Sequence, residues 1–239
     1  MEEKDSFVFT PGVVGYPTVF VLIIWLVFWF EIRFDLSFNH YGIFPRTPEG
    51  LRGIIFSPFI HGDLKHLFNN SVPLFVLSMS LFYFYRSISW SILGYGLLLT
   101  GLLTWVLGRP AFHIGASGII YCLAAFLFFK GVFSKHYRLV ALSLIVVFLY
   151  GGMLWYVTPV DPEISWEGHL SGLLVGIFFS LIYRKKIARA PTYAWEKDTY
   201  KEEDDPFMKH FDKEGNFIEN PYWESEKDNP SDTEDRSSV

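Results

Sequence analysis

The sequence predicts an all-α membrane protein, a bundle of six transmembrane helices with a long outer loop between the first two. The chain is 51% hydrophobic and only 19% charged. Its apolar residues also gather in blocks of about 18–20, the length of helix that crosses ~30 Å of hydrocarbon. The blocks cover roughly residues 13–31, 67–85, 90–107, 112–130, 138–157 and 167–184.

The first block, residues 13–31, is too long and too aromatic for a cleaved signal peptide, and no small-residue cleavage site follows it. We therefore expect it to remain as the first span. The connection of residues 32–65 contains the apolar run LRGIIFSPFI and is expected to lie in or on the membrane interface. The single cysteine, Cys122, lies inside a block, so no disulfide framework is expected. We expect Cys122 to be a small buried packing residue.

The distribution of Lys and Arg predicts the orientation of the spans. One set of short flanking segments carries most of the basic residues: Arg86, Lys130, Lys135, Arg138, Arg184, Lys185, Lys186 and Arg189. The opposite short loops carry one basic residue and three acids: Arg109, Asp161, Glu163 and Glu167. Because basic loops stay in the cytoplasm, both termini are predicted to be cytoplasmic, and the 32–65 loop faces outward although it holds four basic residues.

Charge and composition divide the chain into three predicted regions. Residues 1–12 form a cytoplasmic N-terminus, 13–184 the six-helix core and 185–239 a cytoplasmic tail. Residues 190–239 contain 15 acidic but only 6 basic residues and little apolar periodicity, so the tail is expected to be largely disordered. No basic stripe with interleaved aromatic residues is present, so nucleic acid is not an expected partner.

Three polar stretches begin the second, fourth and sixth spans. They are HLFNN at 66–70, HIGASG at 113–118 and EGHLSG at 167–172. In the predicted topology these spans all start at the outer side, so the three stretches lie at a similar membrane depth. Polar side chains at such a depth are costly unless they pair or face a wet cavity, and they often mark function.

Each stretch has both a packing interpretation and a chemical one. His66 and Asn70 share a helix face at i, i+4 and suit either an interhelical hydrogen bond or the stabilisation of an anion. Ser117 lies between Gly115 and Gly118, which suit either close helix packing or a nucleophile beside the free N–H groups of a helix N-terminus.

The third stretch contains a candidate base for a serine nucleophile. His169 precedes glycines at four-residue spacing, Gly172 and Gly176, which allow a neighbouring helix to approach closely. Taken alone, it could equally be a satisfied intramembrane histidine. No acid falls inside spans two to six except Glu167 at the edge, so a Ser–His dyad is the simplest arrangement, with Tyr121 one turn after Ser117 to orient His169. His113 is expected to be an ordinary interfacial residue.

Together, H-x-x-x-N, G-x-S-G and a histidine followed by spaced glycines, in this order, resemble the rhomboid intramembrane serine proteases over residues 13–184. The resemblance implies that Ser117 is the nucleophile and His169 the general base. It also implies that His66, Asn70 and the Ser117 N–H stabilise the oxyanion, and that the Tyr121 ring stacks under the base. His61 matches a further family histidine. The family's Trp-Arg pair is Leu51-Arg52 here, so the aromatic residue is lost.

The function so implied is hydrolysis of peptide bonds in or near transmembrane segments of other proteins, without a cofactor. Substrates, the expected partners within the lipid bilayer, would enter by the fifth span, where Leu149, Trp155 and Tyr156 form a bulky gate. A bacterial plasma membrane suits this motif set. Two alternatives stay open: a metalloprotease or metal transporter using His61, His66 and His169, and a non-catalytic relative that binds transmembrane clients.

Overall fold

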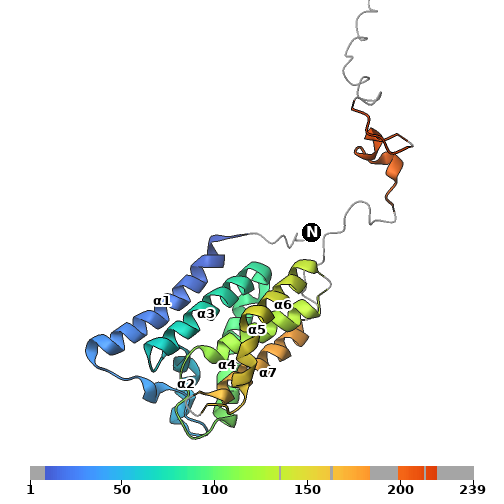
Figure 1. Ribbon diagram of the computed structural model, residues 1–239. Coiled ribbons are helices and arrows are strands. Elements are labelled where there is room, and N and C mark those ends of the chain that lie inside the picture. Colours follow the sequence, from blue (N-terminus) through green and yellow to red (C-terminus); the bar gives the residue numbers. More distant parts are fainter. Residues whose placement is uncertain (1–8, 135, 162–163, 184–198, 213, 220–239) are drawn as a thin grey trace, which may run out of the picture. The chain divides into compact units, whose positions relative to one another are not determined.

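The computed structural model describes residues 9–134, 136–161, 164–183, 199–212 and 214–219 (Figure 1). The chain divides into two compact units, Met1–Ala190 and Pro191–Val239. Across the described residues there are seven α-helices and no strand, which confirms the all-α class. The helices are α1 Pro11–Phe34, α2 Gly53–Phe56, α3 Leu64–Phe84, α4 Ser89–Leu107, α5 Ser117–Val132, α6 Tyr137–Tyr150 and α7 Trp166–Ile182.

Four helical segments of the described chain are long and apolar enough to cross a membrane. They are Pro11–Phe34, Leu64–Phe84, Arg86–Leu107 and Tyr137–Val157. Two further apolar helices are shorter, α5 with 16 residues and α7 with 17. At 1.5 Å per residue these two span only about 24–26 Å. The six apolar blocks of the sequence therefore correspond to four long segments and two short ones.

The fourth apolar block begins its helix later than the sequence suggested. Residues 112–116 are not helical, and α5 starts at Ser117. The backbone of His113 pairs instead with Ile43 through two hydrogen bonds of 3.0 and 2.9 Å. Gly115 then adopts φ +102°, a conformation that side chains other than glycine rarely tolerate. This turn, rather than hydropathy, fixes the first residue of α5.

The fifth block is helical throughout but changes its helix type. The α-helix α6 ends at Tyr150, and a 3₁₀ helix follows over Gly151–Val157. The change coincides with Gly151 and Gly152, since glycine is a poor α-helix former. Seven residues is long for a 3₁₀ helix, because its hydrogen-bond geometry is poorer than that of an α-helix.

Residues 35–63, between α1 and α3, fold onto the end of α4. The short helix α2 packs against α4, where a Cβ placed on Gly101 would lie 2.8 Å from Ile54. Arg46 donates from Nη1 to the carbonyls of Val106 at 3.0 Å and Gly108 at 2.8 Å, so it caps the C-terminus of α4. Asp63 caps α3 by accepting a hydrogen bond from the His66 N–H at 2.8 Å.

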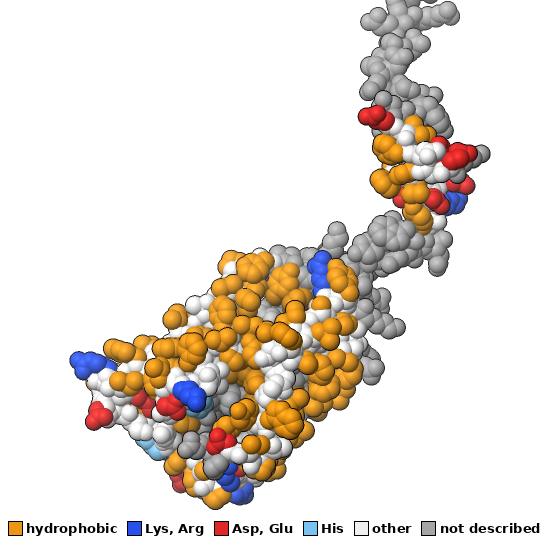
Figure 2. All heavy atoms as spheres, in the orientation of Figure 1, with side chains coloured by type: hydrophobic (Ala, Val, Ile, Leu, Met, Phe, Trp, Pro, Cys, Tyr) orange, Lys and Arg blue, Asp and Glu red, His pale blue; other side chains and the backbone are white. Residues whose placement is uncertain are grey.

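Helix α5 is the centre of the first unit, since it packs against α3, α4, α6 and α7 (Figure 1). Its side chains Leu123, Phe126 and Leu127 are fully buried, as is the expected packing residue Cys122. Apolar side chains cover much of the visible face of the helices in Figure 2, and Phe148 on α6 is 88% exposed. Such an exterior suits lipid contact, because lipid does not penalise exposed apolar side chains.

The described part of the second unit holds two 3₁₀ helices, Glu202–Asp204 and Met208–His210, and an isolated bridge between Phe211 and Phe217. Residues 1–8 of the expected N-terminal region 1–12, and most of the expected tail, lie outside the described residues. The domain boundaries at 12 and 184, and the largely disordered character of the tail, remain predictions.

Candidate active site

Ser117 is the first residue of α5, in the turn where backbone N–H groups have no acceptor within the helix. The turn before it is held by a hydrogen bond from the Gly115 N–H to the Ser57 carbonyl, at 2.8 Å. A serine at this point carries its hydroxyl beside several N–H donors.

Two glycines of α7 bring that helix into direct contact with α5. A Cβ placed on Gly172 would lie 2.1 Å from the Gly118 carbonyl oxygen, and one on Gly176 would lie 2.3 Å from the Cys122 carbonyl oxygen. Both distances are shorter than any side chain permits, so the two backbones touch only because these residues are glycines. His169 lies one turn before Gly172 and thereby reaches the start of α5.

The approach places His169 against Ser117. His169 Nε2 is 2.9 Å from Ser117 Oγ, and His169 Nδ1 is 2.9 Å from the carbonyl oxygen of Tyr156. A carbonyl oxygen only accepts hydrogen bonds, so Nδ1 carries the proton and donates it. Nε2 of the neutral ring is then the acceptor, and the Ser117 hydroxyl donates to it. This tautomer is the one in which a histidine can remove a proton from serine.

Tyr121 supports the histidine from below. Its ring stacks on that of His169, with the ring centroids 4.2 Å apart and the planes 11° from parallel. Its hydroxyl donates to the Met153 carbonyl at 2.6 Å. The sequence pointed to Tyr121 beside His169, and the two rings are indeed in contact.

The 3₁₀ helix Gly151–Val157 supplies backbone acceptors that sequence reasoning missed. Its Tyr156 carbonyl binds His169, and its Met153 carbonyl binds Tyr121. The sequence offered Tyr156 only as a bulky gate residue. The adjacent glycines at 151 and 152 were a signal of irregular backbone there, but they do not show which carbonyls turn inward. The side chains of the three predicted gate residues, Leu149, Trp155 and Tyr156, are exposed by 54%, 75% and 43%.

His66 and Asn70 lie on α3 beside the turn that precedes Ser117. A Cβ placed on Gly115 would lie 2.5 Å from His66 Nε2 and 3.2 Å from Asn70 Nδ2. Both nitrogens therefore adjoin the backbone two residues before Ser117. Helix spacing predicted that His66 and Asn70 share a face, and the alternation of spans predicted a depth similar to that of Ser117; the structure brings the residues together.

His61 lies beneath this pair and holds Asn70 in place. Asn70 Nδ2 donates to His61 Nε2 at 3.0 Å, and the His61 and His66 rings pack edge to face with centroids 5.0 Å apart. Burial, followed by the nearby His66, lowers the pKa of His61 to about 4. His61 is thus neutral at pH 7 and can accept the hydrogen bond. An amide nitrogen has two hydrogens, so Asn70 retains a second donor.

A small cavity of about 40 Å³ adjoins Ser117 on the side of α4. Its polar lining consists of hydroxyl groups and a ring, from Ser57, Thr100, Thr104, His113, Ser117 and Ser165. The volume is enough for a single water molecule, and the polar groups could hold one. The cavity is therefore a suitable place for water close to the serine.

His113 is not the ordinary interfacial residue that the sequence suggested. It is only 4% exposed, and its ring contacts Ser165 Oγ from Nδ1 at 2.6 Å and the Arg109 carbonyl from Nε2 at 3.1 Å. The expectation failed because one ring partner of His113, Ser165, lies 52 positions away, which local hydropathy does not reveal.

Leu51 and Arg52 lie outside this cluster, in the connection between α1 and α3. Arg52 donates from Nη2 to the His40 carbonyl at 3.0 Å and lies 4.6 Å over the Tyr41 ring. Leu51 is 43% exposed. The arginine thus holds its own loop together and does not reach the serine.

No group of three or more His, Cys, Asp or Glu side chains in the described chain is arranged to hold a metal ion. In the trio considered for zinc, His61 Nε2 is bound to Asn70 and His169 Nε2 to Ser117. Two of the three rings are thus engaged in hydrogen bonds, and the three histidines are not arranged as a tetrahedral metal site.

Comparison with known sequences identifies the family. The family model of the Rhomboid domain matches residues 48–186, which is more than half of the chain. The chain belongs to the rhomboid family, and its apolar helices make it an integral membrane protein.

Relatives occur in mycobacteria. Uncharacterized proteins of Mycobacterium bovis and Mycobacterium tuberculosis are each 36% identical to the chain over 183 residues, covering 69% of this chain and 73% of theirs. An uncharacterized protein of Mycobacterium leprae is 32% identical over 157 residues, 59% of each chain.

Proposed function

We propose that the protein is an intramembrane serine endopeptidase that cleaves transmembrane segments of other membrane proteins. The observation that carries this proposal is the pair of contacts made by His169. One ring nitrogen accepts from Ser117 at 2.9 Å while the other is held by a backbone carbonyl at 2.9 Å. These contacts support the assignment of a nucleophile, its base and a group that orients the base.

In the first step, the Ser117 hydroxyl attacks the substrate carbonyl carbon and gives its proton to His169 Nε2. The Tyr156 carbonyl then faces the N–H of an imidazolium ion, and the stacked Tyr121 ring lies against its face. Both contacts favour the charged ring, the second through a cation–π interaction. They take the place of the carboxylate found in a Ser-His-Asp triad.

The tetrahedral oxyanion would be stabilised by His66 Nε2, Asn70 Nδ2 and the Ser117 N–H. The first two adjoin the Gly115 backbone, and the third belongs to the first turn of α5. Each such donor is typically worth about 3 kcal/mol of activation barrier. Collapse of the intermediate returns the proton to the leaving amine and forms an acyl-enzyme, which water from the neighbouring cavity then hydrolyses.

The short helices support a site that lies within the membrane. If six helices cross the bilayer with both termini in the cytoplasm, α5 and α7 are shorter than ~30 Å of hydrocarbon. Their starts, with Ser117 and His169, then lie below the outer surface while remaining open to it. Substrate helices enter sideways, past α6 and the 3₁₀ helix that follows. The mycobacterial relatives suit a bacterial plasma membrane.

The test is cleavage of a single-span protein with a helix-destabilised segment, co-reconstituted with the enzyme in liposomes. We expect wild-type protein to cut within or beside the span, and Ser117→Ala and His169→Ala to be inactive. Ser143→Ala is the control, because Ser143 is buried and its hydroxyl donates to the Val140 carbonyl of its own helix, away from His169. Equal cleavage by wild type and Ser117→Ala would contradict the proposal.

Two further arms separate the alternatives. A zinc chelator should leave the cleavage rate unchanged, whereas the same chelator would abolish cleavage by a metalloprotease. A non-catalytic client-binding relative would retain the single-span protein in a pull-down from detergent but release no fragment from it.

A further inference from the structure

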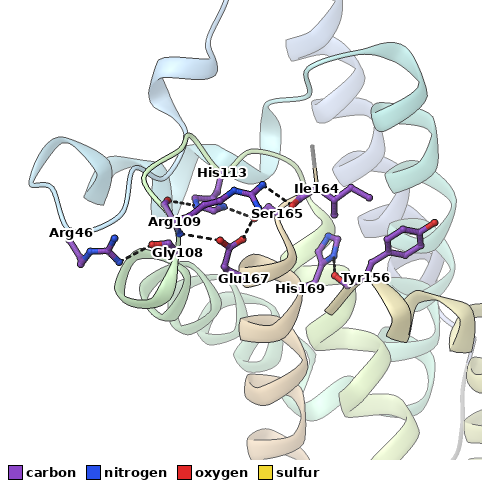
Figure 3. A network of polar contacts seen from close by, with 9 residues as sticks. All are labelled: Arg46, Gly108, Arg109, His113, Tyr156, Ile164, Ser165, Glu167 and His169. Atoms are coloured by element: carbon purple, nitrogen blue, oxygen red, sulfur yellow. Dashed lines mark hydrogen bonds and ion pairs between the residues drawn. The ribbon is translucent and has the colours of Figure 1, made fainter. Parts of the chain in front are cut away.

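Arg109, the one basic residue of the predicted short outer loops, meets Glu167, the acid at the edge of the last span (Figure 3). The Glu167 carboxylate is only 2% exposed. Its Oε1 accepts from the Arg109 N–H at 3.1 Å, and its Oε2 lies 3.9 Å from Arg109 Nη1. Arg109 Nη2 also donates to the Ile164 carbonyl at 3.0 Å. Arg109 thus binds the segment at the start of α7 through two residues, Ile164 and Glu167.

A second connection runs parallel to the first. His113 joins the Arg109 carbonyl to the Ser165 hydroxyl through its two ring nitrogens, at 3.1 and 2.6 Å (Figure 3). Both connections bind the loop of residues 108–116 to the residues that open α7. We refer to Arg109, His113, Ser165 and Glu167 as the polar clamp.

The polar clamp lies next to both reacting groups. His113 is four residues before Ser117, and Glu167 is two residues before His169. The helices themselves are in contact further along, at Gly172 and Gly176. The glycines therefore fix the helix bodies, and the polar clamp fixes their N-terminal ends, where the 2.9 Å contact between Ser117 and His169 is made.

We propose that Arg109, His113 and Glu167 are positioning residues. They hold the loop of residues 108–116, which precedes Ser117, in register with helix α7, which carries His169. The proposal rests on the proposed function, since it assigns these residues to the Ser117–His169 reaction. They touch neither reacting atom, and they act through the two segments that carry them. A displacement of about 1 Å between reacting groups can lower a rate by about 100-fold, so a loosened clamp affects catalysis before it affects folding.

This role is tested with the single variants Glu167→Gln and Arg109→Met and with the double variant that combines them. Glu167→Gln keeps an acceptor for the Arg109 N–H but removes the charge, and we expect kcat to fall about 10–100-fold with KM nearly unchanged. Arg109→Met leaves a buried carboxylate without its ion pair, so it should be the worse single variant. The double should be no worse than Arg109→Met, because the two residues act as one unit.

Glu31→Gln is the matched control. Glu31 is also buried, 7% exposed, and its carboxylate accepts from the Phe38 N–H at 2.6 Å across a turn, but it lies at the end of α1. The thermal midpoints of Glu31→Gln and Glu167→Gln should be similar, while only Glu167→Gln loses kcat. Equal kcat in the two variants would overturn the proposal. If Glu167→Gln does not fold, Ser165→Ala, which removes one hydroxyl, serves in its place with an expected loss of a few-fold.

A readout without catalysis separates this proposal from the proposed function. Spin labels at Ala111→Cys and Val160→Cys report the distance between the two loops. The distance distribution should broaden in Glu167→Gln and stay narrow in Glu31→Gln. Unchanged distributions in both would overturn the clamp even if wild-type protein cleaves. If the distribution broadens in Glu167→Gln but the wild-type protein neither cleaves substrate nor is labelled at Ser117, the clamp is retained and the proposed function is rejected.

Discussion

Gly172 of α7 lies directly against the backbone of Gly118 in α5, so close that a Cβ on Gly172 would be 2.1 Å from the Gly118 carbonyl oxygen. The contact lies one residue after Ser117 and one turn after His169. The distance between the serine and the histidine therefore depends on the absence of a side chain at Gly172.

Gly172→Ala should push α7 away from α5 and lose most of the activity. The obstructing atom is backbone and cannot rotate aside, so we expect destabilisation of about 1–3 kcal/mol as well. Thermal unfolding in detergent and the cleavage rate measure the two effects. Gly94→Ala is the control, because a Cβ there meets nothing within 4 Å. Activity at the wild-type level in Gly172→Ala would show that the helices do not need this contact.

Substitutions of Tyr121 should separate its two contacts. Tyr121→Phe keeps the stacking on His169 but loses the hydrogen bond to Met153, so we expect kcat to fall a few-fold. Tyr121→Leu loses both the stacking and the hydrogen bond, so its kcat should fall by at least about 10-fold. Steady-state kinetics on one substrate gives the comparison. If Tyr121→Leu matched Tyr121→Phe, the ring would have no part in supporting the base.

Gly115→Ala should abolish activity by acting on the oxyanion donors. Gly115 has φ +102°, and its added Cβ would lie 2.5 Å from His66 Nε2. The substitution thus strains the turn and displaces His66. Residual labelling of Ser117 by a small phosphonylating reagent, measured beside substrate cleavage, checks this. Normal cleavage would indicate that His66 does not act where we place it.

The buried His61 should make stability depend on pH. Its folded pKa is about 4, below the ordinary value of 6.5. Between these values the unfolded chain binds a proton that the folded chain does not, so stability falls as the pH is lowered through this window. The slope approaches about 1.4 kcal/mol per pH unit inside this window, and it fades as the pH rises past 6.5.

His61→Gln isolates that contribution, because glutamine accepts a hydrogen bond from Asn70 but does not titrate. The free energy of unfolding of the variant should change less between pH 6.5 and pH 4.5 than that of the wild type. Identical slopes would mean that His61 does not stay neutral in the folded protein.

Much of the site was predictable because its side chains belong to regular helices. Helical spacing predicted that His66 and Asn70 share a face, that Tyr121 lies a turn after Ser117, and that spaced glycines bring His169 near. Alternation of spans then predicted a common depth. These inferences need only the period of the helix and the order of the spans.

The remaining parts depend on backbone paths that hydropathy does not encode. The carbonyl groups of Met153 and Tyr156 turn inward only because the α-helix gives way to a 3₁₀ helix. The pairing of Arg109 with Glu167 joins residues 58 positions apart. Neither leaves a local signal in a single sequence. The late start of α5 likewise follows from the turn at Gly115 and the pairing of His113 with Ile43.

The central claim is that His169 activates Ser117, and the most direct measurement is phosphonylation of the purified protein followed by intact-mass and peptide analysis. A fluorophosphonate replaces fluoride with the serine oxygen, and the reaction requires an activated serine. We expect one adduct on wild-type protein, located at Ser117, and none on Ser117→Ala or His169→Ala. An adduct of equal yield on His169→Ala, or one located at another serine, would contradict the account.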